Sequence, residues 1–203
     1  MRILVTGGAG FVGTNLIKQL LKEGHEVISV DDYSTGKKEN HIQGCQYIQR
    51  DILDINKESF VFDIDIVFHL AAKARIQPSF EQPLEYIRVN YEGTLNLIQL
   101  CLNKNIPLIY AGSSSVHSGN LKNPYTFSKN MGEDIIQLYT KHFGLKSSIA
   151  RFYNVYGPYQ LTEGGYTTLI GRWINNINNG IQCEIYGDGN KRRDFTHVED
   201  IIK

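Results

Sequence analysis

The chain has 203 residues, of which 41% are hydrophobic and 21% charged, a composition that predicts a folded protein with a substantial core. Its 21 basic residues balance its 21 acidic residues, which argues against nucleic acid or an anionic membrane as the partner. The three cysteines are far apart and lack the spacing of metal ligands or a disulfide framework. We therefore expect a cytoplasmic protein that binds a small molecule and no metal.

Short apolar runs bounded by turn residues predict six buried strands, over Arg2–Thr6, Val27–Asp31, Gln46–Gln49, Asp65–Leu70, Pro107–Ala111 and Ser147–Phe152. Apolar residues at helical spacing predict three clear helices, over Phe11–Lys22, Tyr86–Asn103 and Ser128–His142. The N-terminal residues are interpreted as the first strand and not as a secretion signal. The alternation predicts an α/β fold of the Rossmann type, a doubly wound parallel sheet that binds ligands at the carboxyl ends of its strands.

The segment between the first strand and the first helix reads TGGAGFVG. Gly7 permits a tight turn, Gly10 lets the backbone approach a pyrophosphate, and Gly13 lets the helix pack closely on the sheet. The helix begins at Phe11 and Val12, where free N–H groups can bind phosphates. A simple tight turn would also use glycines, but the position between a strand and a helix favours a dinucleotide site.

Asp31 ends the second strand, where a carboxylate can accept hydrogen bonds from the hydroxyls of the adenosine ribose. The same carboxylate repels a 2′-phosphate, so the sequence predicts NAD and not NADP. Lys37 and Lys38 follow closely and are interpreted as solvated loop charges. His69 is interpreted as a packed strand residue. Further residues at strand ends are expected to lie along the dinucleotide, namely Asp51, Ile52, Leu70, Ala71 and Ala72.

Tyr125 and Lys129 form a Y-x-x-x-K pair at the start of a predicted helix, so their side chains share one face. A nearby ammonium favours the phenolate form of a tyrosine, and the positive nicotinamide ring of NAD acts in the same direction. Tyr125 can then remove a proton from a substrate hydroxyl, while Lys129 also holds the nicotinamide ribose. An exposed helical pair has the same spacing, but five preceding strands of a nucleotide-binding pattern favour catalysis.

Eight segments occur in the order seen in the extended short-chain dehydrogenases that act on nucleotide sugars: TGGAGFVG, VDDYSTG, HLAA, VNYEGTLNLI, SSSV, YTFSK, RFYNVYGP and GDGNKRRDFTHVED. The chain thus resembles the NAD-dependent epimerase/dehydratase family almost from end to end. The resemblance implies that NAD is the cofactor and a nucleotide-diphosphate sugar the substrate. It also implies that the serine ending the fifth strand, here Ser113, acts in catalysis with the tyrosine and the lysine, unless the three serines are only a polar loop.

Four further residues acquire roles from this resemblance. Ser114 and Asn154 match positions that contact the substrate, and Asn90 matches an asparagine that supports the cofactor end of the site. Arg193 matches an arginine that pairs with the substrate diphosphate, for which a guanidinium offers a fork of donors. For the two asparagines, helix or turn capping is the alternative.

Family dehydratases and decarboxylases usually carry an acidic residue directly after the catalytic serine or threonine, where this chain has Ser114 and Ser115. Elimination of water needs a second group that transfers protons. The absence of an acidic residue here therefore favours 4-epimerisation through a transient 4-keto sugar. His117 stands where the family has a tyrosine, and the connection from it to Tyr125 is shorter than usual, which leaves the sugar open. A dehydratase or reductase of the same family, and an NAD-binding module without turnover, are the alternatives.

The stretch Tyr156–Tyr166 is the best candidate for a domain boundary. We expect an NAD-binding domain over residues 1–156 and, over residues 157–203, a partial substrate-binding region that is truncated relative to the family. The helices Tyr86–Asn103 and Ser128–His142 resemble those that pair in family dimers through a four-helix bundle. The sequence therefore predicts a homodimer.

Overall fold

A computed structural model describes residues 1–55, 62–185 and 187–203. Strands and helices alternate through most of these residues, as the apolar pattern predicts. The strands are β1 (Arg2–Thr6), β2 (Glu26–Asp31), β3 (Cys45–Gln49), β4 (Ile66–His69), β5 (Leu108–Ser113), β6 (Ser147–Phe152), β7 (Val155–Tyr156) and β8 (Thr196–His197). The α-helices are α1 (Phe11–Lys22), α2 (Ile76–Glu81), α3 (Pro83–Ile87), α4 (Gly93–Lys104), α5 (Pro124–Phe143), α6 (Leu169–Asn178) and α7 (Val198–Ile201).

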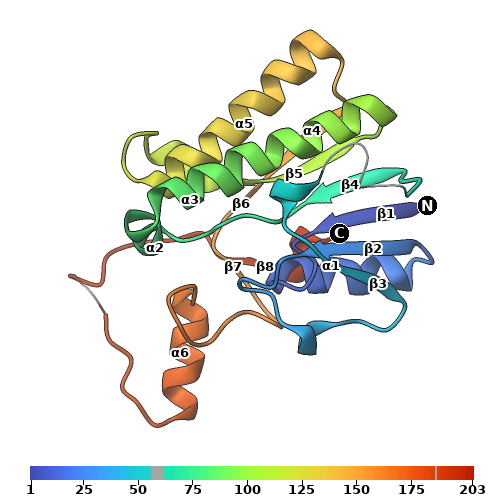
Figure 1. The fold of residues 1–203 in the computed structure, drawn as a ribbon. Helices are drawn as coiled ribbons and strands as arrows, with labels where there is room; N and C mark the ends of the chain where they lie inside the picture. The colour runs from blue at the N-terminus through green and yellow to red at the C-terminus, as the bar shows by residue number, and fades with distance from the viewer. Residues whose placement is uncertain (56–61, 186) are drawn as a thin grey trace.

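Six parallel strands form the main sheet in the order β3-β2-β1-β4-β5-β6 (Figure 1). The order reverses between β1 and β4, because the chain builds outward to one side first and then to the other. At such a switch point the loops that follow neighbouring strands diverge and leave a crevice at the carboxyl ends. The predicted Rossmann-type fold is thus confirmed.

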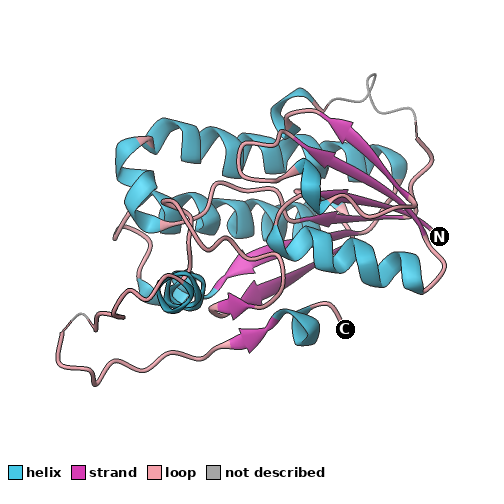
Figure 2. Cartoon of the chain, turned by 90° about the horizontal axis from the view of Figure 1, so that it is seen from below, coloured by secondary structure: helices cyan, strands magenta, loops and turns pink. Residues whose placement is uncertain are grey.

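Helices cover both faces of the sheet (Figure 2). On one face α4 and α5 enclose the larger core, in which Leu97, Ile98 and Ile136 are fully buried. On the other face α1 packs Leu16 and Ile17 onto β1 and β2. The central strands β1, β2, β4 and β5 are largely buried, as predicted, because both faces of the sheet are covered. The prediction of six buried strands is wrong for the edge strands β3 and β6, which are partly exposed and contain polar residues between their apolar ones. No helix among the described residues is long and apolar enough to cross a membrane.

Two predicted helices differ from the observed ones at their beginnings. The helix predicted over Tyr86–Asn103 is broken by a π-helical turn, Arg88–Glu92, which separates α3 from α4. Helix α5 begins four residues before its predicted start, because the side chain of Asn123 accepts a hydrogen bond from the Thr126 N–H at 2.8 Å. Asn123 therefore caps the helix, and Tyr125 lies in its first turn.

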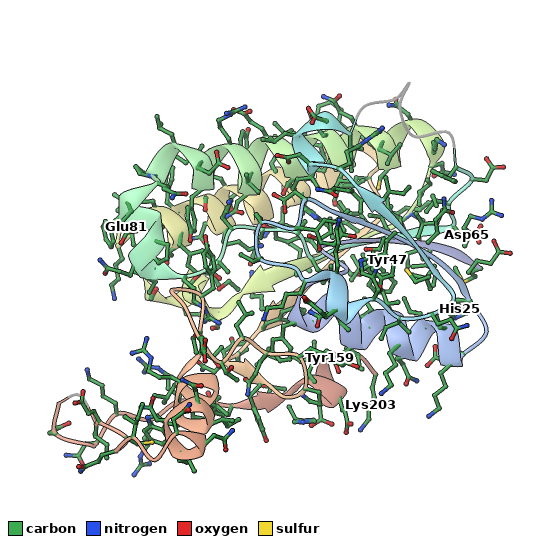
Figure 3. All side chains as sticks on the ribbon, turned by 60° about the horizontal axis from the view of Figure 1, so that its bottom comes forward. His25, Tyr47, Asp65, Glu81, Tyr159 and Lys203 are labelled. Carbon is green, nitrogen blue, oxygen red and sulfur yellow. The ribbon has the colours of Figure 1, made fainter. Side chains whose placement is uncertain are left out.

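The residues after β6 leave the sheet and partly return to it. Helix α6 lies apart from the main sheet, whereas β8 pairs with β7 and α7 lies near α1 (Figure 1). The division at residue 156 stays a prediction. Figure 3 marks the two ends of the sheet, since His25 and Asp65 precede β2 and β4 while Glu81 lies on the opposite side. The carboxyl ends of the strands therefore face toward the side of Glu81.

Candidate active site

A cavity of about 1050 Å³ lies at the carboxyl ends of the strands, above the switch point. It is lined by every predicted site residue except Asn90. Those residues are Gly7, Gly10, Phe11, Val12, Gly13, Asp31, Asp51, Ile52, Leu70, Ala71, Ala72, Ser113, Ser114, Tyr125, Lys129, Asn154 and Arg193. Segments far apart in the sequence therefore meet around one space, as the strand-end positions predict.

Glycine is required at two places in the turn between β1 and α1. A Cβ on Gly13 would lie 2.2 Å from the carbonyl oxygen of Gly7, so only glycine lets the helix start this close to the strand. Gly7 has a φ of +72°, and a Cβ there would lie 2.7 Å from the backbone nitrogen of Ala71. At Gly10 no side chain caps the helix, so the first N–H groups of α1 are free for an anion.

The carboxylate of Asp31 is fixed at the end of β2. One oxygen accepts the N–H of Ala9 at 2.9 Å and the other accepts the N–H of Tyr33 at 2.8 Å. Burial raises the pKa of Asp31, while these two hydrogen bonds oppose that effect. The side chain is 6% exposed and lines the cavity, so it can present an acceptor to a hydroxyl group from a defined direction.

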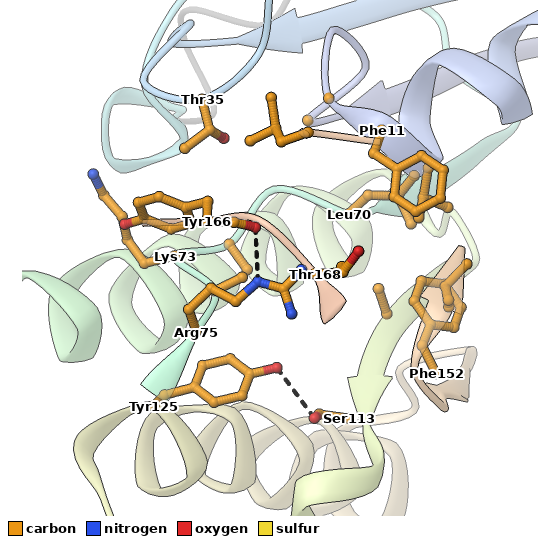
Figure 4. A pocket seen from close by; sticks show the side chains of 18 of the residues that line it. Phe11, Thr35, Leu70, Lys73, Arg75, Ser113, Tyr125, Phe152, Tyr166 and Thr168 are labelled. Carbon is orange, nitrogen blue, oxygen red and sulfur yellow. Dashed lines mark hydrogen bonds between the residues drawn. The ribbon is translucent and has the colours of Figure 1, made fainter. Parts of the chain in front are cut away.

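Ser113 and Tyr125 meet at the floor of the cavity (Figure 4). The Tyr125 hydroxyl donates to the Oγ of Ser113 at 3.1 Å, and the same Oγ accepts the N–H of Ser115 at 3.2 Å. Burial raises the pKa of Tyr125, and the hydrogen bond with Ser113 and the positive charge of Arg75 oppose this rise. Arg75 is therefore a cation that favours the phenolate of Tyr125, while the role predicted for Lys129 stays a prediction.

Lys129 lies on the same side of α5 as Tyr125, but its ammonium contacts the sheet. The Nζ donates to the carbonyl of Ala111 at 2.7 Å and lies 4.2 Å from the centre of the Tyr110 ring. Burial lowers the pKa of Lys129 to about 7, and the negative charge of Glu133 opposes that effect. Lys129 is thus held in position at the cavity wall with a proton that it can lose near neutral pH.

Glu133 lies one turn further along α5 and is 2% exposed. One carboxylate oxygen forms a salt bridge with Arg151, with 2.8 Å between oxygen and Nη2, and the other accepts the N–H of Ser113 at 3.3 Å. A Cβ at Gly112 would lie 2.6 Å from Glu133, so glycine there makes room for the carboxylate. Glu133 therefore holds the backbone of Ser113 and acts electrostatically on Lys129.

Asn90 lies behind the cavity wall, in the π-helical turn. Its side chain accepts the N–H of Lys73 at 2.7 Å and donates to the carbonyl of Lys73 at 3.0 Å and to the Oγ of Ser128 at 2.9 Å. These bonds fasten the loop after β4 to α5. His69, also outside the cavity lining, is 1% exposed and bonds to the hydroxyls of Thr6 and Thr94, which confirms that it is a packed strand residue.

One wall of the cavity comes from residues after β6 and before β8. Asn154 donates from its side chain to the carbonyl of Asp194 at 2.8 Å, which places it next to the segment that carries Arg193. Both residues are exposed and line the cavity, as does Ser114 at the end of β5. The three predicted substrate contacts therefore come from the neighbouring ends of β5 and β6 and from the segment before β8.

Two site residues were missed by the sequence analysis although the sequence carried a signal for each. Arg75 follows the HLAAK segment and lines the cavity, and a cation at that strand end indicates a contact with ligand. Glu133 continues the four-residue spacing of Tyr125 and Lys129, which places it on the same helix face. Tyr166 reaches the site from an irregular segment, and no local pattern indicates this contact.

The comparisons with known proteins agree with this geometry. A family model described as the NAD dependent epimerase/dehydratase family matches residues 3–203. A putative UDP-glucose 4-epimerase from Methanocaldococcus jannaschii is 32% identical over 217 residues, covering 99% of this chain and 71% of that protein. A UDP-N-acetyl-alpha-D-glucosaminuronate decarboxylase from Bacillus cytotoxicus is 33% identical over 223 residues, covering 100% of this chain and 69% of that protein.

Among solved structures, the UDP-glucose 4-epimerase of Thermus thermophilus in complex with NAD superposes with a TM-score of 0.90 at 31% identity. The superposition covers 100% of this chain and 72% of that one. The matched family spans both the glycine turn and the Ser113, Tyr125 and Lys129 cluster. The chain belongs to the NAD dependent epimerase/dehydratase family.

Proposed function

We propose that the protein is an NAD-dependent nucleotide-sugar epimerase that inverts the sugar at C4. The observation that carries this proposal is the hydrogen bond of 3.1 Å between Tyr125 and Ser113 on the floor of the cavity. A phenol and a hydroxyl in direct contact can bind one substrate hydroxyl and exchange its proton. The same cavity is lined by the glycine turn and by Asp31, which fit a dinucleotide.

The residues that would hold NAD are arranged along the cavity from the adenosine end to the nicotinamide end. Asp31 would accept the ribose hydroxyls, and the uncapped N-terminus of α1 would bind the pyrophosphate. Ala71 and Ala72 carry only methyl groups and so leave room beside it. Lys129 would bind the nicotinamide ribose. When bound, NAD supplies a hydride acceptor and donor for the sugar carbon.

Residues of this chain remove the proton of the C4 hydroxyl and later return it. Tyr125, as the phenolate, takes the proton of the C4 hydroxyl while C4 becomes a ketone, and Ser113 holds the oxygen through its hydroxyl. The 4-keto sugar then presents its other face, and Tyr125 returns the proton to the oxygen as C4 is reduced. Substrate and product have the same oxidation state, so no net reduced cofactor forms. Ser114, Asn154 and Arg193 would bind the nucleotide-sugar diphosphate and orient the sugar.

Epimerisation is favoured over dehydration by the residues after Ser113. Ser114 and Ser115 carry hydroxyls where elimination of water would require a carboxyl acid. The relatives are named for reactions on both neutral and acidic nucleotide sugars, since one name contains glucose and the other a glucosaminuronate. The sugars in these two names differ at C6, which is a hydroxymethyl group in glucose and a carboxylate in the glucosaminuronate.

The test is to incubate the purified protein with UDP-, dTDP-, GDP- and ADP-sugars and to follow the sugars by NMR. Conversion at C4 without net NADH, abolished in Tyr125→Phe, is the expected result. Replacement of the C6 methylene signals by a methyl signal, with formation of a 4-keto-6-deoxy sugar, would instead identify a dehydratase. Retention of NAD without conversion of any sugar would contradict the proposal and identify a cofactor-binding module.

A further inference from the structure

Arg75 occupies an unusual place in the cavity. It is the residue directly before α2, and its φ of +87° is a conformation that side-chain-bearing residues rarely adopt. Such a conformation costs about 1–3 kcal/mol and persists only where the surroundings enforce it. Here the hydroxyl of Tyr86 donates to the carbonyl of the preceding Ala74 at 2.6 Å, and the Nε of Arg75 donates to the carbonyl of Tyr166 at 2.9 Å.

These bonds hold the half-buried guanidinium in the cavity, next to Tyr125 (Figure 4). Burial lowers the pKa of Arg75, and the ionisable groups that act on it are the phenols of Tyr125 and Tyr86. Among residues 1–55, 62–185 and 187–203, no carboxylate lies within salt-bridge distance of Arg75. The hydrogen bond to Tyr166 uses only the Nε, so the two terminal nitrogens are available to a ligand.

Two other cations that line the cavity have protein partners. Lys73 lies 3.9 Å from a carboxylate oxygen of Glu85, and Lys129 donates to the carbonyl of Ala111. A half-buried cation without an anion is costly, because it loses hydration without gaining a partner. The strained backbone and the hydrogen bond through Nε keep the guanidinium in this unfavourable place in the free protein. An anionic ligand group would remove it.

We infer that Arg75 binds a carboxylate on the sugar, so that the preferred substrate is a nucleotide-linked hexuronate rather than a neutral hexose. This inference rests on the proposed function, because it takes Tyr125 as the group that faces the C4 hydroxyl. In a hexuronate the C6 carboxylate is attached to C5, the ring carbon next to C4. A guanidinium beside Tyr125 therefore lies where that carboxylate arrives, and its planar fork matches the two oxygens.

The diphosphate is the other anion of such a substrate. Its predicted donors, Asn154 and Arg193, come from the wall formed after β6 and before β8, whereas Arg75 follows β4. Two separate sets of donors fit two separate anions. Arg75 would therefore bind the carboxylate of the sugar, whereas Asn154 and Arg193 would bind the diphosphate of any nucleotide sugar.

The experiment measures the affinities of UDP-glucose, UDP-glucuronate and UDP alone for the wild-type protein and for Arg75→Gln by calorimetry with added NAD. Turnover at C4 leaves the charge at C6 unchanged, so the comparison holds for an active protein. We expect the wild type to bind UDP-glucuronate at least about 10-fold more tightly than UDP-glucose. Arg75→Gln should weaken UDP-glucuronate binding by about 10- to 100-fold, the range for hydrogen bonds to a charged group, and should barely affect UDP-glucose.

Arg88→Gln is the matched control, because Arg88 is exposed and pairs only loosely with Glu92, 3.8 Å away. Arg75→Lys keeps the positive charge but lacks the planar pair of donors, so it should recover part of the preference for UDP-glucuronate. Circular dichroism checks that all variants are folded. Equal wild-type affinities for the two sugars would overturn the inference even if C4 conversion occurs. Equal weakening of all three ligands would assign Arg75 to the diphosphate and also overturn it. Preferential hexuronate binding without turnover would support the inference while the epimerase proposal fails.

Discussion

The hydroxyl of Tyr125 donates a 3.1 Å hydrogen bond to the Oγ of Ser113, although the two residues lie on different elements, α5 and β5. This contact makes two side chains a single proton-handling unit. We expect Tyr125→Phe to lower kcat by about 10²- to 10⁴-fold, because it removes the acid–base group. Ser113→Ala should lower kcat less, since the phenol remains. Steady-state kinetics on the substrate found by NMR checks this order, and a more damaging Ser113→Ala would contradict it.

Glu133 is expected to act as a positioning residue. Its charge raises the pKa of Lys129, so Glu133→Gln should shift the deprotonation of Lys129 to lower pH. If the protonated lysine is the active form, the basic limb of the kcat profile then moves to lower pH. Arg151→Gln is the control, because it leaves the carboxylate charged and removes only a half-exposed partner. Identical pH profiles for the wild type and Glu133→Gln would show that Glu133 has no electrostatic role.

The buried Lys129 predicts an unusual dependence of stability on pH in the absence of cofactor. The folded protein loses the lysine proton at about pH 7, whereas the unfolded chain keeps it to about pH 10.5. The unfolded chain thus binds more protons between these values, so raising the pH through this window stabilises the fold. The limiting slope for one proton is about 1.4 kcal/mol per pH unit. Urea unfolding of the wild type and Lys129→Met should diverge across the window, and parallel curves would refute the assignment.

Asp31 should determine cofactor preference. Asp31→Asn removes the charge that repels a 2′-phosphate and one of two acceptors that hold the N–H groups of Ala9 and Tyr33. We expect NAD affinity to fall at least about 10-fold and the preference for NAD over NADP to narrow. Asp134→Asn, at an exposed position of α5 outside the cavity lining, should leave both affinities unchanged. Fluorescence titration with each cofactor measures the effect, and an unchanged preference in Asp31→Asn would count against a ribose contact.

A homodimer through α4 and α5 stays our prediction for the assembly. On α5, Phe127 and Leu138 are 36% and 46% exposed and lie three turns apart on one face. Sedimentation at micromolar concentration should show a dimer, and Leu138→Lys should dissociate it. Ile177→Lys, at an equally apolar exposed site on α6, should not. A wild-type monomer at tens of micromolar would exclude this assembly.

The bounds of β1 and α1 follow from the sequence, because an apolar run, three spaced glycines and a regular amphipathic helix succeed one another without interruption. Helices α2 and α3 could not be predicted in the same way, since Pro78 and Pro83 break the apolar period. The earlier start of α5 was predictable, because Asn123 and Pro124 are typical of a helix N-terminus.

Some residues of the cavity could likewise be predicted from the sequence, and others could not. Residues at strand ends could be placed there because parallel strands bring their carboxyl ends to one edge. The contact of Tyr166 with Arg75 spans 91 residues and joins an irregular segment to a strained loop. Sequence periodicity contains no information on such a pair.

The π-helical turn before α4 also constrains how this helix can change. Helix α4 buries Leu97 and Ile98 in the core, while Asn90, within the preceding π-helical turn, binds the loop after β4. The widened turn therefore sets the angle between Asn90 and the core residues. Deleting one residue there would rotate Asn90 by about 100° relative to the core residues. The length of this helix is consequently a more rigid requirement than the identity of its individual side chains, so insertions and deletions should be absent from it even where substitutions accumulate.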